Sequence, residues 1–315
     1  MTTSEVRSAV PEESAATSLR GRMLIAALRL TRAGKPFSSA AALRESIRES
    51  QQPARDRPPA ALGRRHRVGC REIHGRPVYT IRPRAAGTSR HVMYLHGGAY
   101  VHQIQRDHWK FLSRLIDETG CTVTVPLYPL APENHPRDTF SMVLAAHDAA
   151  FAGAASHDKV LMGDSAGGAL ALVLARALGA AGGVGPKEVV LISPWLDVTM
   201  TDPWARELDP SDPYLGVAGL TEAGRLYAGD LDRTDPLISP LYAPAATPGE
   251  LSLFIGTRDV LLADARRFRT RCAAEGVALE YHEFAGMFHA WPLADIPEAR
   301  RARGDLVRIV NRPPS

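Results

Sequence analysis

The stretch "LMGDSAGGALAL", residues 161–172, places Ser165 between Gly163 and Gly167, directly after a short apolar run and directly before a helix-forming one. Between a strand and a helix, a Gly-x-Ser-x-Gly pattern predicts a sharp turn that leaves the serine oxygen exposed at its tip. Glycine is favoured at both flanks because a Cβ there would collide with the neighbouring strand or helix. The stretch therefore makes Ser165 a candidate nucleophile, with a glycine-flanked serine in an ordinary loop as the alternative.

Apolar runs that read as strands alternate with helix-like segments on both sides of this stretch. The runs cover 67–73 and 76–83 as a hairpin, then 91–95, 121–128, 159–163, 188–194, 251–257 and 278–284. Helices are expected over 107–119, 139–152, 166–181, 262–275 and 297–310. Near-continuous apolar strands separated by helices predict an α/β fold with a mostly parallel, eight-stranded sheet covered by helices on both faces. Such sheets place their active groups at the carboxyl ends of the strands.

Two segments depart from this alternation. Residues 1–65 read as helical stretches broken by polar ones, and residues 199–236 contain several prolines and aromatic residues without a clear strand. We expect both segments to fold over the sheet as a helical cap, which leaves 66–198 and 237–315 as the two parts of the core. A chain of 315 residues is long enough for such a domain with a lid.

Composition is that of a soluble globular protein, with 45% hydrophobic and 23% charged residues. The net charge of +4 comes from dispersed arginines without interleaved aromatic residues, so no nucleic-acid partner is expected. Three cysteines far apart argue against a disulfide framework and fit a reducing compartment. No apolar run approaches the length of a membrane span, and the only candidate signal core is too short. We therefore expect a cytoplasmic protein with no membrane partner.

A serine hydroxyl becomes an effective nucleophile only when a base removes its proton, and a third group must hold that base. Asp259 follows the apolar run 251–255 by a short turn, although it could instead cap the next helix. His289 lies in the loop after the last predicted strand. The chain order Ser165, Asp259, His289 is that of an α/β-hydrolase, as distinct from other serine hydrolases.

Residues 96–100, "HGGAY", directly follow the predicted strand 91–95. Two glycines let the backbone turn so that N–H groups face a cleft, and we expect Gly97, Gly98 and Ala166 to hold an oxyanion there. We expect His96, Glu133 and Asp164 to support these loops. Candidate pocket walls, for each of which core packing within the cap is an equally good explanation, are Tyr100, Trp204, Leu208, Tyr214, Leu215 and Tyr227.

Metal and cofactor chemistry find little support in the sequence. The spacing of His91, His96, His102 and His108 suits no single helix face, and no His-Glu-x-x-His occurs. The glycines in "LGAAGGVGPKE", residues 178–188, follow a helix and precede a strand, which is the reverse of a dinucleotide-binding loop. We expect neither a metal nor a cofactor.

Together these motifs resemble those of the hormone-sensitive-lipase-like family of α/β-hydrolases. The matching segments are "HGGAY" (96–100), "YPLAPENHP" (128–136), "GDSAGG" (163–168), "DPLISPLYA" (235–243), "GTRDVLLADARRF" (256–268) and "GMFHAW" (286–291). Ala99 stands where many members have a third glycine, and Pro129 where many have arginine. Neither change removes a candidate catalytic side chain.

The resemblance implies an α/β-hydrolase fold with a cap, hydrolysis of short-chain acyl esters of small molecules without a cofactor, and frequent dimerisation. Some actinobacterial relatives deacetylate natural-product intermediates, so an N-acetyl amide hydrolase with the same three residues is a second interpretation. A third is a hydrolase scaffold used only to bind a ligand. The presence of Ser165, Asp259 and His289 together argues against that third interpretation.

Overall fold

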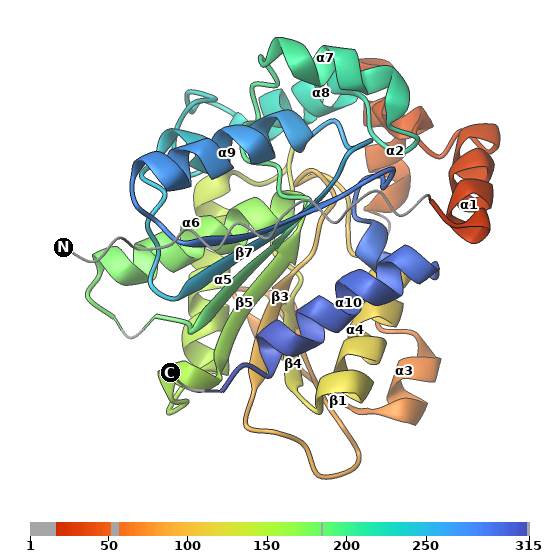
Figure 1. The fold of residues 1–315 in the computed structure, drawn as a ribbon. Helices are drawn as coiled ribbons and strands as arrows, with labels where there is room; N and C mark the ends of the chain where they lie inside the picture. The colour runs from red at the N-terminus through yellow and green to blue at the C-terminus, as the bar shows by residue number, and fades with distance from the viewer. Residues whose placement is uncertain (1–16, 52–56, 184, 314–315) are drawn as a thin grey trace.

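A single eight-stranded sheet forms the centre of the protein in a computed structural model that describes residues 17–51, 57–183 and 185–313 (Figure 1). Its strands lie in the order β1-β2-β4-β3-β5-β6-β7-β8. Their bounds are Arg67–Ile73, Arg76–Arg82, His91–Leu95, Thr122–Pro126, Lys159–Asp164, Glu188–Ile192, Glu250–Gly256 and Leu279–Phe284 for β1 to β8. The pairs β1–β2 and β2–β4 are antiparallel, and all the others are parallel. The expected mostly parallel sheet is therefore confirmed.

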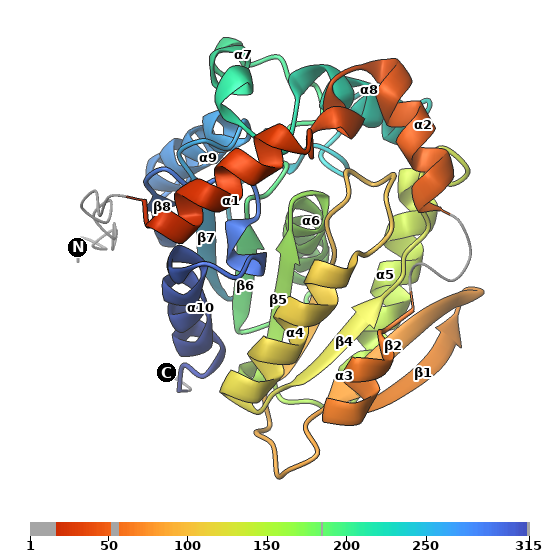
Figure 2. The ribbon, with the colours of Figure 1, turned by 90° about the vertical axis from the view of Figure 1, so that its right-hand side faces the viewer.

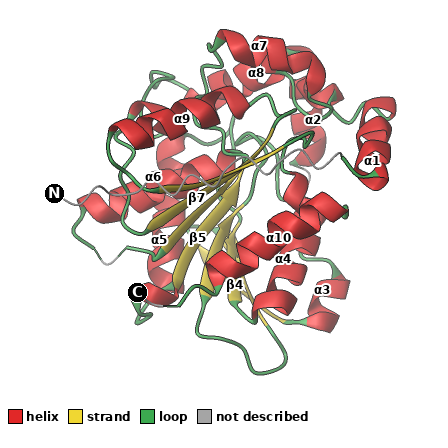
Figure 3. Cartoon of the chain, in the orientation of Figure 1, coloured by secondary structure: helices red, strands yellow, loops and turns green. Residues whose placement is uncertain are grey.

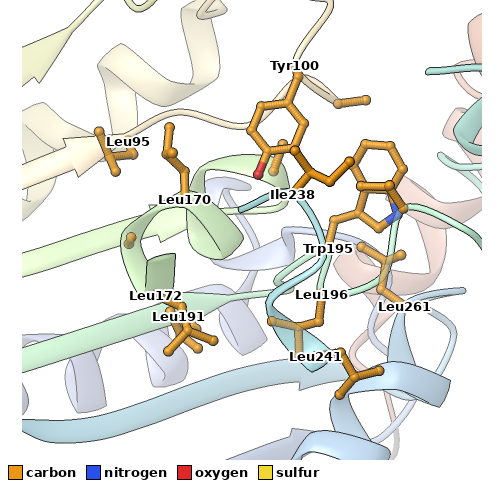
Figure 4. Packing of buried hydrophobic residues seen from close by; sticks show 14 of the residues in the cluster. Leu95, Tyr100, Leu170, Leu172, Leu191, Trp195, Leu196, Ile238, Leu241 and Leu261 are labelled. Carbon is orange, nitrogen blue, oxygen red and sulfur yellow. The ribbon is translucent and has the colours of Figure 1, made fainter. Parts of the chain in front are cut away.

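Helices cover both faces of the sheet (Figures 1 and 3). One face carries α5 (Pro136–Ala150), α6 (Ala166–Ala180) and α9 (Leu262–Ala274), and the other carries α3 (Ala60–Arg65), α4 (Arg106–Thr119) and α10 (Pro297–Val310). Each face of the sheet packs against its helices in a hydrophobic core of its own, and successive residues of a strand point into alternate cores. In β5, Leu161 belongs to the first core, and Val160 and Met162 belong to the second. In the first core, side chains of α6 pack with those that follow β6, among them Leu170 and Trp195 (Figure 4).

Four further helices lie beyond the carboxyl-terminal ends of the parallel strands (Figure 2). They are α1 (Leu19–Leu30), α2 (Ala40–Ser50), α7 (Pro203–Leu208) and α8 (Val217–Ala228). The segments 1–65 and 199–236 meet here, because α2 packs beside α8 and the Arg44 guanidinium lies 2.8 Å from the Glu222 carboxylate. We propose that these helices form the cap over the site.

The largest differences between the sequence expectation and the structure concern the expected cap segment and the start of α5. Helix α3 belongs to the expected cap segment 1–65, but it packs beside α4 and buries Leu62 in the second core. Residues 1–16 and 52–56 of that segment lie outside the described residues. Helix α5 begins at Pro136, three residues before the expected start at 139, because proline fits the first turn of a helix.

Candidate active site

Ser165 occupies the junction between β5 and α6 with φ 53° and ψ −124°, a conformation that non-glycine residues rarely adopt. The turn is tight enough to bring backbone into contact on both sides. A Cβ on Gly163 would lie 2.3 Å from the Gly167 oxygen, and one on Gly167 would lie 2.0 Å from the Leu95 oxygen. The sharp turn predicted from the glycine pattern is therefore present, and both glycines are required by space.

Asp259 and His289 are hydrogen-bonded to each other. Asp259 follows β7 by three residues and is fully buried, while His289 lies in the loop after β8. The Asp259 Oδ2 is 3.0 Å from the His289 Nδ1, and its Oδ1 accepts the Leu261 N–H at 2.9 Å. A carboxylate at Nδ1 keeps the imidazole hydrogen on that nitrogen and leaves Nε2 as a proton acceptor.

The charge around His289 raises the pKa of its imidazole. Burial alone would lower this pKa, but the charge and hydrogen bond of Asp259, followed by the charges of Asp212 and Asp164, outweigh burial. The Tyr214 ring also lies against the imidazole, with ring centroids 6.4 Å apart. Among the described residues no hydrogen bond joins His289 to Ser165, and catalytic bonds of this type are often long without substrate. Both residues line the same pocket.

Asp164 anchors the loop after β3. Its Oδ1 accepts the Tyr94 hydroxyl at 2.6 Å and the Gly97 N–H at 2.8 Å, and its Oδ2 lies 3.3 Å from the His108 Nε2. Burial would raise the pKa of this carboxyl, but His108 and the three hydrogen bonds hold it below the ordinary value. The expected supporting role of Asp164 therefore has a geometric basis.

The Gly97 amide differs from our expectation, because its N–H already donates to Asp164 and is not free to hold an oxyanion. The next two amides of the loop, those of Gly98 and Ala99, have no acceptor among the described residues. Ala166 is the first residue of α6, and the first N–H groups of a helix have no partner within the helix. The free donors near Ser165 therefore belong to Gly98, Ala99 and Ala166.

His96 and Tyr128 make further contacts that hold this loop. The His96 Nδ1 is 2.7 Å from the Gly97 oxygen, its ring stacks on Tyr128 at 4.4 Å, and the Tyr128 hydroxyl donates to the His96 carbonyl. Burial lowers the pKa of His96 to about 4, which keeps the imidazole neutral. Glu133, in contrast, is exposed and has no hydrogen bond among the described residues, so its supporting role stays a prediction.

A cavity of about 580 Å³ opens over Ser165 and His289. Of the six expected wall residues, only Tyr214 and Leu215 line it. Its remaining apolar lining comes largely from the cap and the loop after β8, with Leu24, Leu28, Pro36, Phe37, Phe288 and Leu293.

The other four expected wall residues pack elsewhere, as the alternative of core packing had suggested. Tyr100 and Tyr227 are buried and stack on each other, with centroids 3.8 Å apart. Trp204 lies beneath the Arg266 guanidinium at 4.7 Å, and Leu208 packs against the first core. Their side chains stabilise the cap rather than shape the cavity.

Asp212 is a buried site residue that sequence reasoning missed. It lies in the cap segment between α7 and α8, and its Oδ1 accepts the N–H groups of Tyr214 at 2.8 Å and Leu215 at 3.1 Å. Its Oδ2 accepts the Val260 N–H at 3.0 Å, next to Asp259. Burial and the charge of Asp259 raise the pKa of Asp212 to about 7, although its hydrogen bonds and His289 oppose the shift. One carboxylate thus joins two pocket-lining residues to the loop that carries Asp259.

In the described part of the chain, no three histidine, cysteine or acidic side chains are grouped so that they could hold a metal ion. Asp259 is instead paired with His289, and Asp164 with His108. The arrangement is suited to nucleophilic chemistry by a serine beside an imidazole and a set of free backbone N–H groups.

The chain belongs to the α/β hydrolase fold family, which its residues 92–293 match. Two of its relatives carry the name acetyl-hydrolase. LipR of Mycobacterium tuberculosis, provisionally described as an acetyl-hydrolase, is 35% identical over 237 residues, or 74% of this chain and 77% of that protein. An acetyl-hydrolase of Streptomyces hygroscopicus is 31% identical over 227 residues, or 70% of this chain and 75% of that protein.

Solved structures agree with this placement. An esterase from the bacterial hormone-sensitive lipase family superposes with a TM-score of 0.79 at 28% identity, and the match covers 94% of this chain and 99% of that chain. The resemblance that the sequence motifs indicate is therefore confirmed.

Proposed function

We propose that this protein is a serine esterase that hydrolyses short-chain acyl esters of a small molecule through Ser165, His289 and Asp259. The observation that carries the proposal is that Ser165 and His289 line one cavity while Asp259 lies 3.0 Å from the Nδ1 of that imidazole. The names of the relatives, esterase and acetyl-hydrolase, support the same reaction class.

In the proposed reaction, the Ser165 Oγ attacks the acyl carbonyl carbon and His289 Nε2 takes the hydroxyl proton. The tetrahedral intermediate expels the alcohol, which receives the proton from His289, and an acyl-serine remains. Water then attacks this ester with His289 again as the base, and the carboxylic acid leaves. No cofactor takes part in these steps.

The negative oxygen of the intermediate needs donors that are already in place. We assign this role to the amides of Gly98, Ala99 and Ala166, since Asp164 holds the Gly97 N–H. Gly97 is then a positioning residue, because its bond to Asp164 fixes the course of the loop next to Ser165.

The size and lining of the cavity support a small acyl group on a larger partner. A volume of about 580 Å³ exceeds the needs of an acetyl group, and Leu24 and Leu28 of α1 contribute to its apolar lining. We therefore propose a substrate whose alcohol portion, or amine portion in an amide, fills most of the cavity. A homodimer is a further proposal from the family resemblance.

The experiment that tests the function compares p-nitrophenyl acetate, p-nitrophenyl octanoate and an N-acetyl peptide as substrates, with a serine-reactive phosphonate as a mass label. Acetate turnover above octanoate turnover, with one label on Ser165, is the expected result. Dominant amide cleavage would instead make the protein a deacetylase. A chain that binds ligand but neither turns over any of the three substrates nor takes up the phosphonate would be a binding scaffold.

Replacing Asp164 by alanine is expected to lower kcat by about 10²–10³-fold, because the oxyanion amides lose the anchor of their loop. It should also destabilise the protein by about 3 kcal/mol or more, since the Tyr94 hydroxyl, the Gly97 N–H and the His108 N–H would be buried without an acceptor. Ester turnover and thermal unfolding measure both effects.

Two further variants control this prediction. Asp164→Asn keeps one oxygen for Tyr94 and Gly97 and should recover most of the lost activity. Glu133→Gln changes an exposed side chain of the neighbouring motif and should change nothing. If Asp164→Ala turned over ester within about threefold of wild type, Asp164 would not set the oxyanion loop.

Asp212→Asn is expected to move the acidic limb of the kcat/KM profile to lower pH. The reaction needs neutral His289, so activity falls as pH drops through the raised pKa of that imidazole. The acidic groups that raise this pKa are Asp259, Asp212 and Asp164, and removing one negative charge lowers it. The variant should also unfold more easily, by about 1–3 kcal/mol, because its amide N–H groups would face backbone donors.

Values of kcat/KM measured from pH 5 to pH 9 show whether the acidic limb moves to lower pH. Asp230→Asn is the control, because it removes one exposed charge from the cap surface. The control should reproduce the wild-type limb. If the acidic limb of the Asp212→Asn profile were unchanged, Asp212 would be uncharged in the free enzyme and would act only by holding the backbone of Tyr214, Leu215 and Val260.

A further inference from the structure

The outer face of α1 carries a stripe of apolar side chains in contact with solvent. Five large hydrophobic side chains are exposed among the described residues, and three of them lie on this helix: Leu19 at 66%, Met23 at 62% and Leu30 at 86%. Spacings of four, three and four residues join Leu19, Met23, Ala26 and Leu30, which puts them on one side of the helix. Single exposed apolar residues are ordinary, but a row of them along one short helix is not.

Arginines border this outer stripe on both edges. Arg22 and Arg29 lie along one edge and Arg20 along the other, all three are exposed, and the helix contains no acidic residue. A helix with an apolar stripe between cationic edges has the pattern of a segment that lies in the interface of an anionic lipid layer. Two copies meeting through this stripe would bring arginines against arginines, which disfavours a symmetric contact between α1 helices.

The opposite side of α1 faces the site. Gly21 and Ile25 are buried against the body of the protein, and Leu24 and Leu28 line the cavity over Ser165. Ser18 fastens the start of the helix, since its backbone N–H donates to Glu298 of α10 at 2.6 Å. Figures 1 and 2 show α1 at the edge of the molecule, beyond the carboxyl-terminal ends of the strands. Helix α1 therefore has the cavity on one side and solvent on the other.

We propose that α1 docks the protein on an anionic phospholipid surface, with Leu19, Met23 and Leu30 in the interface and the arginines on lipid phosphates. This is peripheral contact: in the described ranges none of the helices is long and apolar enough to cross a bilayer. It departs from the sequence expectation of no membrane partner, which rested on the lack of a spanning segment. Docking there would set the cavity beside the lipid layer, where apolar esters dissolve.

Vesicle flotation of the full chain tests this directly and does not depend on the proposed reaction. Vesicles of phosphatidylcholine alone are compared with equal parts phosphatidylcholine and phosphatidylglycerol, at about 0.05 M and about 0.5 M salt. We expect binding to the anionic vesicles at least about tenfold tighter than to the neutral ones, and weaker at high salt.

Three variants locate the contact. Met23→Ser/Leu30→Ser removes the apolar stripe and Arg22→Gln/Arg29→Gln removes one cationic edge, and each should weaken binding by about tenfold or more. Val68→Ser changes an exposed apolar side chain on β1 and should bind like wild type. Because these side chains are exposed, folding should survive, which thermal unfolding verifies.

Three results would overturn the proposal. One is wild-type binding to anionic vesicles no stronger than to neutral vesicles. Another is binding that persists in Met23→Ser/Leu30→Ser. The third is a wild-type dimer in light scattering that this double variant converts to monomer, since the stripe would then be covered by a second copy. Loss of ester turnover with intact vesicle binding would count against the proposed function alone.

Discussion

Ser165→Ala should lower kcat for p-nitrophenyl acetate by about six orders of magnitude, to the background that binding and the oxyanion donors supply. The alanine should leave the turn intact, because the hydrogen bonds at this position are made by its backbone. The Ser165 N–H donates to Ile192, and its carbonyl accepts from Gly168 and Trp195. The loss can therefore be attributed to the missing hydroxyl.

Two measurements make this expectation specific. Mass spectrometry should find the phosphonate label on wild type and not on Ser165→Ala, and thermal unfolding should match between the two. Ser141→Ala, at an exposed serine of α5, should keep both label and turnover. Residual turnover above about a thousandth of wild type would mean that another group attacks the ester.

The sheet could be predicted because its parallel strands are buried on both faces. Such strands appear in the sequence as short, nearly continuous apolar runs, as 159–163 and 188–192 do. The packing of helix α3 could not be predicted, because its six residues contain one buried leucine within a stretch rich in proline and arginine. Its position depends on Leu62 meeting the core beside α4, which no local pattern encodes.

Only those site residues could be predicted that directly follow a strand recognisable in the sequence. Ser165, Asp259 and His289 each follow a recognisable strand, and parallel strands bring those ends together. Asp212 has no such signal: its partner Val260 lies 48 residues away, and the bond goes to a backbone N–H that any residue could supply. Gly97 was expected to be an oxyanion donor for the same reason: the glycines of a loop do not reveal which of its amides donates to Asp164.

The cap also limits prediction of the substrate. Tyr214 and Leu215 line the cavity, whereas Trp204 and Leu208 a few residues earlier do not. Short helices such as α7 offer too few turns for an apolar period to separate inward from outward faces. Asp212 fixes which residues turn inward, through hydrogen bonds rather than through side-chain pattern.

Asp259→Asn is expected to lower kcat by about 10⁴-fold, through the tautomer of His289. The carboxylate now accepts from His289 Nδ1 and from the Leu261 N–H with separate oxygens. Asparagine has one oxygen, and keeping it on Leu261 turns the NH₂ group toward Nδ1. The imidazole must then accept at Nδ1 and carry its hydrogen on Nε2, where it cannot take the serine proton. The reverse orientation would bury two donors against each other at Leu261, at a cost of about 1–3 kcal/mol.

Single-turnover kinetics of wild type and Asp259→Asn measure this loss, and Asp264→Asn provides the matched control. Asp264 is a buried carboxylate five residues further along the chain, but its bond goes to Arg267, 2.8 Å away, and not to His289. Its replacement should leave kcat within about tenfold of wild type, while phosphonate labelling of Asp259→Asn should slow in step with its turnover. Retention of more than about a tenth of wild-type activity in Asp259→Asn would show that another carboxylate orients His289. Asp212, whose charge also reaches that imidazole, would then be the group to replace next.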